Sequence, residues 1–161
     1  KVGDRVTALP LFPCCACEAC DAHMPNLCAH GNWAGVTPER PGAYAEYVIA
    51  RGSLLQAVPA GIADAEAAMI EPLAVGHHTV ARAQIRPGEA VLIIGGGPIG
   101  AAAALFARAA GARHVVVSEP AAARRERCGL LGATATIDPT NEDVGARFAA
   151  LAGKRPDVVF E

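Results

Sequence analysis

The sequence predicts an α/β protein in which a doubly wound parallel sheet follows a region of short strands and turns. From residue 88 onward, short apolar segments alternate with segments of strong helix formers, as strands and helices alternate in a parallel sheet. Before residue 61, short extended segments are separated by frequent glycine and proline residues. We therefore expect two parts, residues 1–60 and 61–161, each a portion of a larger domain.

The composition excludes several classes of protein. Of the 161 residues, 52% are hydrophobic, which is enough for a core, and the net charge of −2 offers no basic surface for nucleic acid. No apolar run reaches the about 20 residues that span a membrane, and no signal peptide opens the chain. Five of the six cysteines lie within residues 14–28, which favours metal binding in a reducing, cytoplasmic compartment over a secreted disulfide scaffold.

The first part of the chain contains the less regular elements. Short extended segments predict strands at residues 5–9, 44–49 and 54–58. In residues 44–49 successive side chains alternate in character after a Pro-Gly turn, as in a strand. Two helices are expected next. The first covers residues 64–70, with Asp64 as its cap, and the second lies within residues 71–83 and begins just after Pro72.

The second part is a regular alternation of strands and helices. It predicts strands near residues 90–94, 114–118, 134–137 and 157–160, and helices near residues 98–110, 120–131 and 141–152. A complete sheet of this type has about six strands. Because the sequence starts without methionine and ends on a new strand, we expect it to belong to a longer protein.

A glycine-rich turn joins the first of these strands to its helix. Gly95, Gly97 and Gly100 have the G-x-G-x-x-G spacing, and Pro98 occupies the first helical position, where its missing N–H group costs nothing. The first two glycines let the backbone approach a pyrophosphate, Gly100 lets helix and strand pack closely, and the helix N-terminus supplies N–H donors. The turn therefore predicts a dinucleotide site, with a tight turn that binds no ligand as the alternative.

The next strand ends at Glu119, which predicts the choice of cofactor. An acid at this position accepts hydrogen bonds from the hydroxyls of the adenosine ribose and repels a 2′-phosphate, which favours NAD over NADP. Arg124 and Arg125 weaken this argument, because either is close enough in sequence to reach a phosphate. The alternative for Glu119 is a solvated acid at the end of a strand.

A compact cysteine cluster predicts a structural metal site. Cys14, Cys17, Cys20 and Cys28 have the spacing C-x2-C-x2-C-x7-C, and four thiolates satisfy a tetrahedral zinc ion without an open position. Cys15 is left over, because two neighbouring ligands would be strained around one ion. Disulfides are the alternative, and His23 and His30 are better explained as solvated loop residues than as ligands.

Several motifs resemble those of the zinc-dependent medium-chain alcohol/polyol dehydrogenases, with the butanediol, sorbitol and threonine dehydrogenases as the most similar branch. The motifs are Gly-Asp-Arg-Val at residues 3–6, the four cysteines, Gly-Ala-Tyr-Ala-Glu-Tyr-Val at residues 42–48, Glu-Pro-Leu-Ala-Val-Gly at residues 71–76 and the glycine turn. The resemblance spans essentially the whole chain. It implies part of a GroES-like β domain followed by part of a Rossmann-type domain that binds NAD.

The resemblance also implies roles for individual residues. The four cysteines would bind the structural zinc, Glu119 and Arg124 the adenosine ribose, and Ile99 and Val75 would lie near the nicotinamide. Glu71 would contribute to a catalytic zinc, whose other ligands in this branch lie upstream of the cysteine cluster and are absent from these residues. A helix N-terminal glutamate that interacts with the dipole is the alternative for Glu71. His78 occupies a position where the family often has histidine, whereas we assign His77 to packing or to the surface.

The expected activity is the oxidation of a secondary alcohol or diol to a ketone, with hydride transfer to NAD and zinc as the Lewis acid. The intact enzyme would be a homodimer or homotetramer without nucleic-acid or membrane partners. With most ligands of the catalytic zinc missing, we expect no alcohol oxidation by these 161 residues alone. The alternatives are a non-catalytic module that binds NAD and zinc, a zinc-free member similar to quinone reductases, and a zinc-ribbon nucleic-acid binder, which the net charge disfavours.

Overall fold

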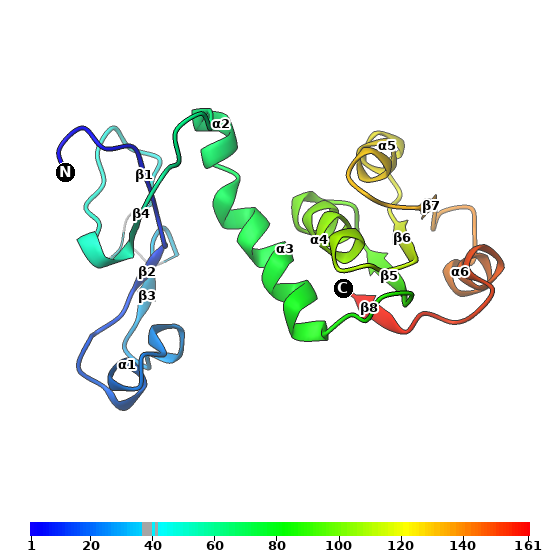
Figure 1. Ribbon diagram of the computed structural model, residues 1–161, viewed down its shortest axis with the longest axis horizontal. Helices are drawn as coiled ribbons and strands as arrows, with labels where there is room; N and C mark the ends of the chain where they lie inside the picture. Colours follow the sequence, from blue (N-terminus) through cyan, green and yellow to red (C-terminus); the bar gives the residue numbers. More distant parts are fainter. Residues whose placement is uncertain (37–39, 41) are drawn as a thin grey trace. The chain divides into compact units, whose positions relative to one another are not determined.

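The computed structural model describes residues 1–36, 40 and 42–161 (Figure 1). By their contacts these residues form two compact units, Lys1–Ala68 and Met69–Glu161. The domain boundary that we expect between residues 60 and 61 stays a prediction. No helix in the described ranges is long and apolar enough to cross a bilayer.

The first unit consists of short elements. In chain order they are β1 (Val6–Ala8), β2 (Leu11–Phe12), α1 (Glu18–Asp21), the 3₁₀ helix η1 (Pro25–Leu27), β3 (Asn32–Trp33), the 3₁₀ helix η2 (Gly52–Leu54), β4 (Leu55–Ala57) and α2 (Asp64–Ala67). β1 pairs antiparallel with β4, and β2 pairs antiparallel with β3. The expected strands at residues 5–9 and 54–58 are therefore confirmed as a pair.

The strand expected at residues 44–49 is wrong. These residues have no regular secondary structure, and the side chains of Tyr44, Tyr47 and Ile49 are exposed. Within the described ranges no other strand pairs with this segment. Alternation alone does not make a strand, because the backbone groups of an extended segment need a partner strand.

Two details at the helix ends also differ from expectation. Asp64 is the first helical residue of α2 rather than its cap, and its carboxylate instead accepts hydrogen bonds from the Arg5 guanidinium at 3.0 and 2.6 Å. The helix ends at Ala67 rather than at residue 70. The next helix starts at Ile70, so Pro72 lies inside its first turn, where backbone N–H groups have no partner in the helix.

The second unit is a four-stranded parallel sheet with helices on both faces. Its elements are α3 (Ile70–Ala83), β5 (Ala90–Ile94), α4 (Pro98–Ala109), β6 (His114–Ser118), α5 (Ala122–Leu130), β7 (Ala135–Ile137), α6 (Val144–Ala152) and β8 (Val158–Phe160). The strand order is β7-β6-β5-β8, and every pairing is parallel. The expected strands and helices of this part are confirmed to within a few residues. The order reverses between β5 and β8, as in a doubly wound sheet.

Side chains from alternate positions of the strands form two separate cores. On one face, Val91 and Val117 pack with alanines of α4 and with residues of α3 and α5; on the other, Leu92 and Val116 pack with Phe148 of α6. In Figure 1, α3, α4 and α5 lie on one side of the sheet and α6 on the other. Strands buried on both faces explain the continuous apolar runs in the sequence.

Candidate functional site

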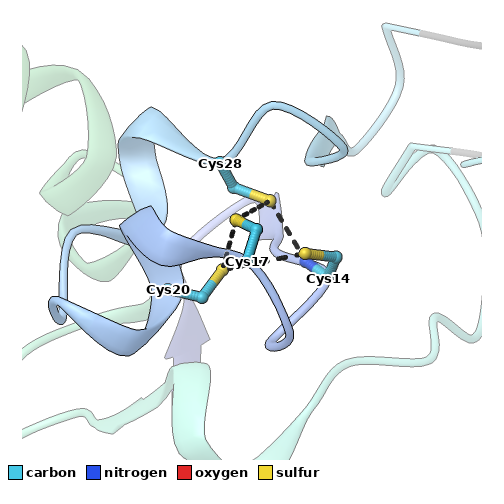
Figure 2. Close-up of side chains that lie close together, drawn as sticks. All are labelled: Cys14, Cys17, Cys20 and Cys28. Carbon is cyan, nitrogen blue, oxygen red and sulfur yellow. Dashed lines mark hydrogen bonds between the residues drawn. The ribbon is translucent and has the colours of Figure 1, made fainter.

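The four cysteines predicted to bind a metal lie together in the first unit. Cys14 and Cys17 lie in the loop between β2 and α1, Cys20 lies in α1, and Cys28 directly follows η1. Their four Sγ atoms all lie within 4.8 Å of one another, and Figure 2 shows them pointing toward a common centre. Among the described residues this is the only group of three or more potential metal-ligating side chains.

The sulfur distances fit a zinc ion. The Sγ of Cys20 lies 4.0 Å from that of Cys14 and 3.6 Å from that of Cys17, and the Sγ atoms of Cys17 and Cys28 are 3.8 Å apart. Four sulfurs bound at about 2.3 Å around one zinc ion stand about 3.8 Å from each other. A disulfide needs about 2.05 Å, and all six cysteines are free. The geometry therefore fits a closed tetrahedral site.

A backbone N–H group in this cluster favours the thiolate of Cys28. The Cys14 N–H group donates to the Sγ of Cys28 at 3.3 Å, and this bond is the main cause that lowers the pKa of Cys28 to about 6. A thiolate is the form that binds metal. The cluster thus holds one ligand ready for zinc near neutral pH.

The neighbouring Cys15 and the two histidines lie outside the cluster. Cys15 is exposed, has a φ of 59°, and its Sγ lies 2.6 Å from the Arg51 guanidinium. His23 and His30 are also exposed, and neither joins the group of ligand atoms. The structure therefore separates the spare cysteine from the other four, as the spacing predicted.

In the second unit, the glycine turn links β5 to α4. Gly95 has a φ of +98°, and its N–H group donates to the Ser118 carbonyl of β6 at 2.8 Å. A Cβ atom at Gly100 would lie 2.0 Å from the carbonyl oxygen of Gly95, so only glycine fits there. A Cβ atom at Gly97, the N-cap of α4, would meet no protein atom within 4 Å, which leaves this side of the turn open to a ligand.

Two cavities border the turn, and Gly97 and Pro98 line both of them. One, of about 420 Å³, is lined by Gly97, Leu105 and Arg124 among others. The second, of about 370 Å³, includes Ile99 and Phe160 and lies at the carboxyl ends of β5 and β8. This second cavity is at the point where the strand order reverses, which is where ligands bind in sheets of this kind.

Glu119 is buried directly beside the turn. It is 3% exposed, and its carboxylate accepts hydrogen bonds from the N–H groups of Ala121 and Gly96, both at 2.8 Å. These two bonds lower the pKa of Glu119 below its ordinary value of 4.5, and the guanidinium of Arg124, 3.9 Å away, acts in the same direction. Glu119 is therefore ionised at neutral pH, and each of its oxygens keeps a lone pair for a further donor.

The two arginines that follow have different surroundings. The Arg124 side chain is 60% exposed and extends beside the Glu119 carboxylate. Arg125 instead donates to the carbonyl oxygens of Glu119 and Pro120 and pairs with Asp138. Of the two, Arg124 is free to meet a ligand, whereas the Arg125 guanidinium is already bonded to three protein groups.

The residues expected near the reacting groups lie on α3 and α4. Glu71 is exposed in the first turn of α3, and no cluster of potential metal ligands includes it in the described part of the chain. Val75 and Ile99 are each about two-fifths exposed. His77 packs edge-on against Phe106, at 5.1 Å between ring centroids, so its assignment to packing is consistent with this contact. His78 is exposed.

Sequence reasoning overlooked Gly96 and the role of Arg125. A Cβ atom at Gly96 would lie 2.9 Å from Cγ of Glu119 and 3.1 Å from Sγ of Cys128. The run of three glycines at residues 95–97 is the signal for this close approach. The pairing of Arg125 with Asp138 has no sequence signal, because it depends on how α5 meets the end of β7.

Comparisons with known proteins identify the family. Residues 1–60 match the alcohol dehydrogenase GroES-like domain, and residues 98–161 match the zinc-binding dehydrogenase family. The chain belongs to the zinc-dependent medium-chain dehydrogenases. The fold class, a partial GroES-like domain before a partial Rossmann-type sheet, is confirmed.

Individual relatives agree with this assignment. The chain is 37% identical to 2-dehydro-3-deoxy-L-galactonate 5-dehydrogenase from Pseudoalteromonas atlantica, over 99% of this chain and 46% of that protein. It is 35% identical to sorbitol dehydrogenase from Bacillus subtilis, over 100% of this chain and 46% of that protein. A candidate zinc-binding dehydrogenase from Sinorhizobium meliloti 1021, solved bound to NADP, matches with 37% identity and a TM-score of 0.81 over 88% of this chain and 41% of that one. The chain thus spans about half the length of the curated relatives it matches.

Substitutions are expected to distinguish the four cysteines of the cluster from the neighbouring Cys15. Cys17→Ser removes one of four thiolates, so bound zinc should fall from one ion per chain toward zero and the free energy of unfolding should drop. Cys15→Gly is expected to keep the zinc and to add about 1 kcal/mol of stability, because glycine adopts a positive φ without strain. Zinc content by atomic absorption and unfolding in urea check both. Loss of zinc in the Cys15 variant would contradict the assignment.

The Glu119 carboxylate is expected to make stability depend on pH. Because its pKa is lower in the folded than in the unfolded chain, its stabilisation is complete above the unfolded pKa of about 4.5. It is lost as the pH falls through the folded pKa. Glu119→Gln is therefore less stable than the wild type at pH 7, and the difference shrinks in acid. Urea unfolding between pH 7 and pH 3 measures this, with the exposed Glu126→Gln as control. An equal difference at every pH would argue against this role of the carboxylate.

Proposed function

We propose that this chain is part of a zinc-dependent dehydrogenase that transfers a hydride from a secondary alcohol or a diol to NAD. The observation that carries the proposal is the ionised carboxylate of Glu119, held beside an open glycine turn in a chain of the medium-chain dehydrogenase family. An acid at this position suits the ribose hydroxyls of NAD.

The second unit would bind the cofactor. Gly95, Gly97 and the N-terminus of α4, which begins at Pro98, would face the pyrophosphate, while Gly100 keeps the turn compact. Glu119 would accept hydrogen bonds from the adenosine ribose, and the exposed guanidinium of Arg124 would lie over the same ribose. Ile99 and Val75 would contact the nicotinamide, which accepts hydride when the cofactor is bound.

The first unit would bind a structural zinc through Cys14, Cys17, Cys20 and Cys28. The only buried hydrophobic residues described in this unit are Leu11 and Ala67, so metal binding would supply stability that its core does not. The thiolates also require a reducing environment, which supports a cytoplasmic location.

Glu71 would contribute to a second, catalytic zinc, which polarises the alcohol in enzymes of this kind. Its carboxylate is a suitable ligand and is exposed at the start of α3. The other ligands would come from residues outside these 161, so the whole enzyme is the catalytic unit. Its substrates would be polyols or sugar acids, as the names of the relatives suggest, and the whole enzyme would be a homodimer or homotetramer.

Two alternative functions remain, a non-catalytic module that binds NAD and zinc and a zinc-free member similar to quinone reductases. The four-cysteine cluster supports the zinc-dependent branch over the second. The non-catalytic module differs from our proposal only in that it turns over no substrate, so the activity of the whole enzyme distinguishes the two.

The cofactor preference is the direct test of the nucleotide site. We expect isothermal titration of this chain to give a dissociation constant for NADH about tenfold or more below that for NADPH, because the Glu119 carboxylate repels a 2′-phosphate. Glu119→Ala should narrow the difference. Tighter binding of NADPH by the wild type would overturn the assignment of NAD.

Turnover tests the catalytic part of the proposal. A whole enzyme that contains this chain should reduce NAD in the presence of zinc and a panel of polyols, detected by absorbance at the NADH band. Glu71→Ala should lower kcat about 10–100-fold, as the loss of groups that tune a metal site does, while the affinity for NADH is retained. These 161 residues alone should show no turnover. Robust turnover by them would mean that the missing ligands are dispensable.

A further inference from the structure

We propose that Arg125 and Asp138 form a clamp that positions Glu119 for the hydroxyls of the adenosine ribose. Arg125 is then a positioning residue of the dinucleotide site rather than a phosphate ligand. This inference rests on the proposed binding of NAD and concerns how the same site recognises the ribose.

The Arg125 guanidinium holds the backbone at the site of the acid. Its Nη1 donates to the carbonyl oxygen of Glu119 at 2.7 Å and to that of Pro120 at 2.6 Å. Its Nη2 lies 3.1 Å from Oδ2 of Asp138. The Arg125 and Asp138 side chains are 20% and 22% exposed, so the pair is largely shielded from water. Charge-assisted bonds of this kind are among the stronger ones in proteins.

Asp138 is itself fixed in place. It directly follows β7, and its Oδ1 accepts hydrogen bonds from the N–H group of Thr140 at 3.0 Å and from the Thr140 hydroxyl at 2.6 Å. The amide of Asn141 donates to its Oδ2 at 3.3 Å. These bonds, with that from the Thr140 hydroxyl the largest cause, lower the pKa of Asp138, so it is charged at neutral pH. Asp138 therefore binds the Arg125 guanidinium from a hydrogen-bonded position directly after β7.

The backbone of Glu119 is thus held on both sides. Its N–H group donates to the Ile137 carbonyl of β7 at 3.0 Å, and its carbonyl oxygen is held by Arg125. With the carboxylate bonded to Gly96 and Ala121, little freedom remains for the acid to move. Hydrogen bonds to two ribose hydroxyls require a carboxylate in one position, and a misplacement of about 1 Å is costly at such sites.

A pair of nucleotides that differ only in the ribose hydroxyls tests the clamp. The probes are ADP and 2′,3′-dideoxy-ADP, titrated calorimetrically into the wild-type chain and into Arg125→Met. We expect the wild type to bind ADP about tenfold more tightly than the dideoxy analogue, because hydrogen bonds to a charged group have about this strength. The ratio of the dissociation constant of the analogue to that of ADP is called the ADP ratio. In Arg125→Met it should fall to about twofold, because ADP binds more weakly while binding of the analogue is nearly unchanged.

Two further variants separate positioning from general damage. Arg108→Met removes a guanidinium that donates to the carbonyl oxygens of Ala112 at 2.6 Å and Arg113 at 3.4 Å, just before β6 and at the opposite end of that strand from Glu119. It should lower stability without changing the ADP ratio. Asp138→Asn leaves the Arg125 bonds to the carbonyls and should reduce the ratio less than Arg125→Met does. If Arg125→Met fails to fold, the ADP ratio of Asp138→Asn tests the clamp instead.

The outcomes distinguish the two proposals. If the wild type binds neither nucleotide, the proposed function is wrong. If the wild type discriminates and both clamp variants keep its ratio, the clamp is wrong and the proposed function stands. The clamp is also wrong if Arg108→Met lowers the ratio as much as Arg125→Met, because the loss then follows stability.

Discussion

The hydrogen bond from Gly96 N–H to the buried Glu119 carboxylate joins the two parts of the proposed nucleotide site. It connects the turn after β5 with the end of β6, and its 2.8 Å length is possible because Gly96 has no side chain. The N–H groups of Ala121 and Gly96 stabilise the charge, and because that of Gly96 belongs to the turn, the conformation of the turn and the ionisation of the acid depend on each other. Hydrogen bonds within the protein thus fix the acid and the turn, which would reduce the cost of ordering them when the proposed cofactor binds.

The cysteine cluster has the same relation between geometry and charge in a unit with little core. Two helical turns and two loops bring four sulfurs to tetrahedral spacing, and a backbone N–H group favours the thiolate of Cys28. The cost of this arrangement is visible at Cys15, which adopts a positive φ between two ligands. Glycine would adopt this conformation without strain. The chain instead has a strained cysteine there, in a loop that bound metal would hold in place.

The sequence allowed most of the second unit to be predicted, because strands buried on both faces leave a strong apolar pattern. Its short spacings also singled out the four cysteines, which the structure brings together, and Glu119, which it buries beside the glycine turn; the roles of these residues stay predictions. It failed at residues 44–49, where a strand needs a partner that no local pattern supplies, and at Asp64, whose carboxylate pairs with the distant Arg5 instead of capping α2. The clamp of Arg125 was missed for the same reason, because its partner Asp138 lies beyond α5 in the chain, after β7.

Adjacent residues on α5 illustrate why such assignments need three dimensions. Arg124 and Arg125 are identical in chemistry, but consecutive side chains on a helix point about 100° apart. One therefore stays exposed beside the Glu119 carboxylate, and the other reaches the end of β7 and holds the backbone of the same residue. A positive charge on either side of Glu119 stabilises its ionised form, yet only Arg124 remains free for the cofactor. The proposed preference for NAD would then depend on the whole strand end, in which Arg124 would contact the ligand and Arg125 holds the backbone of the acid.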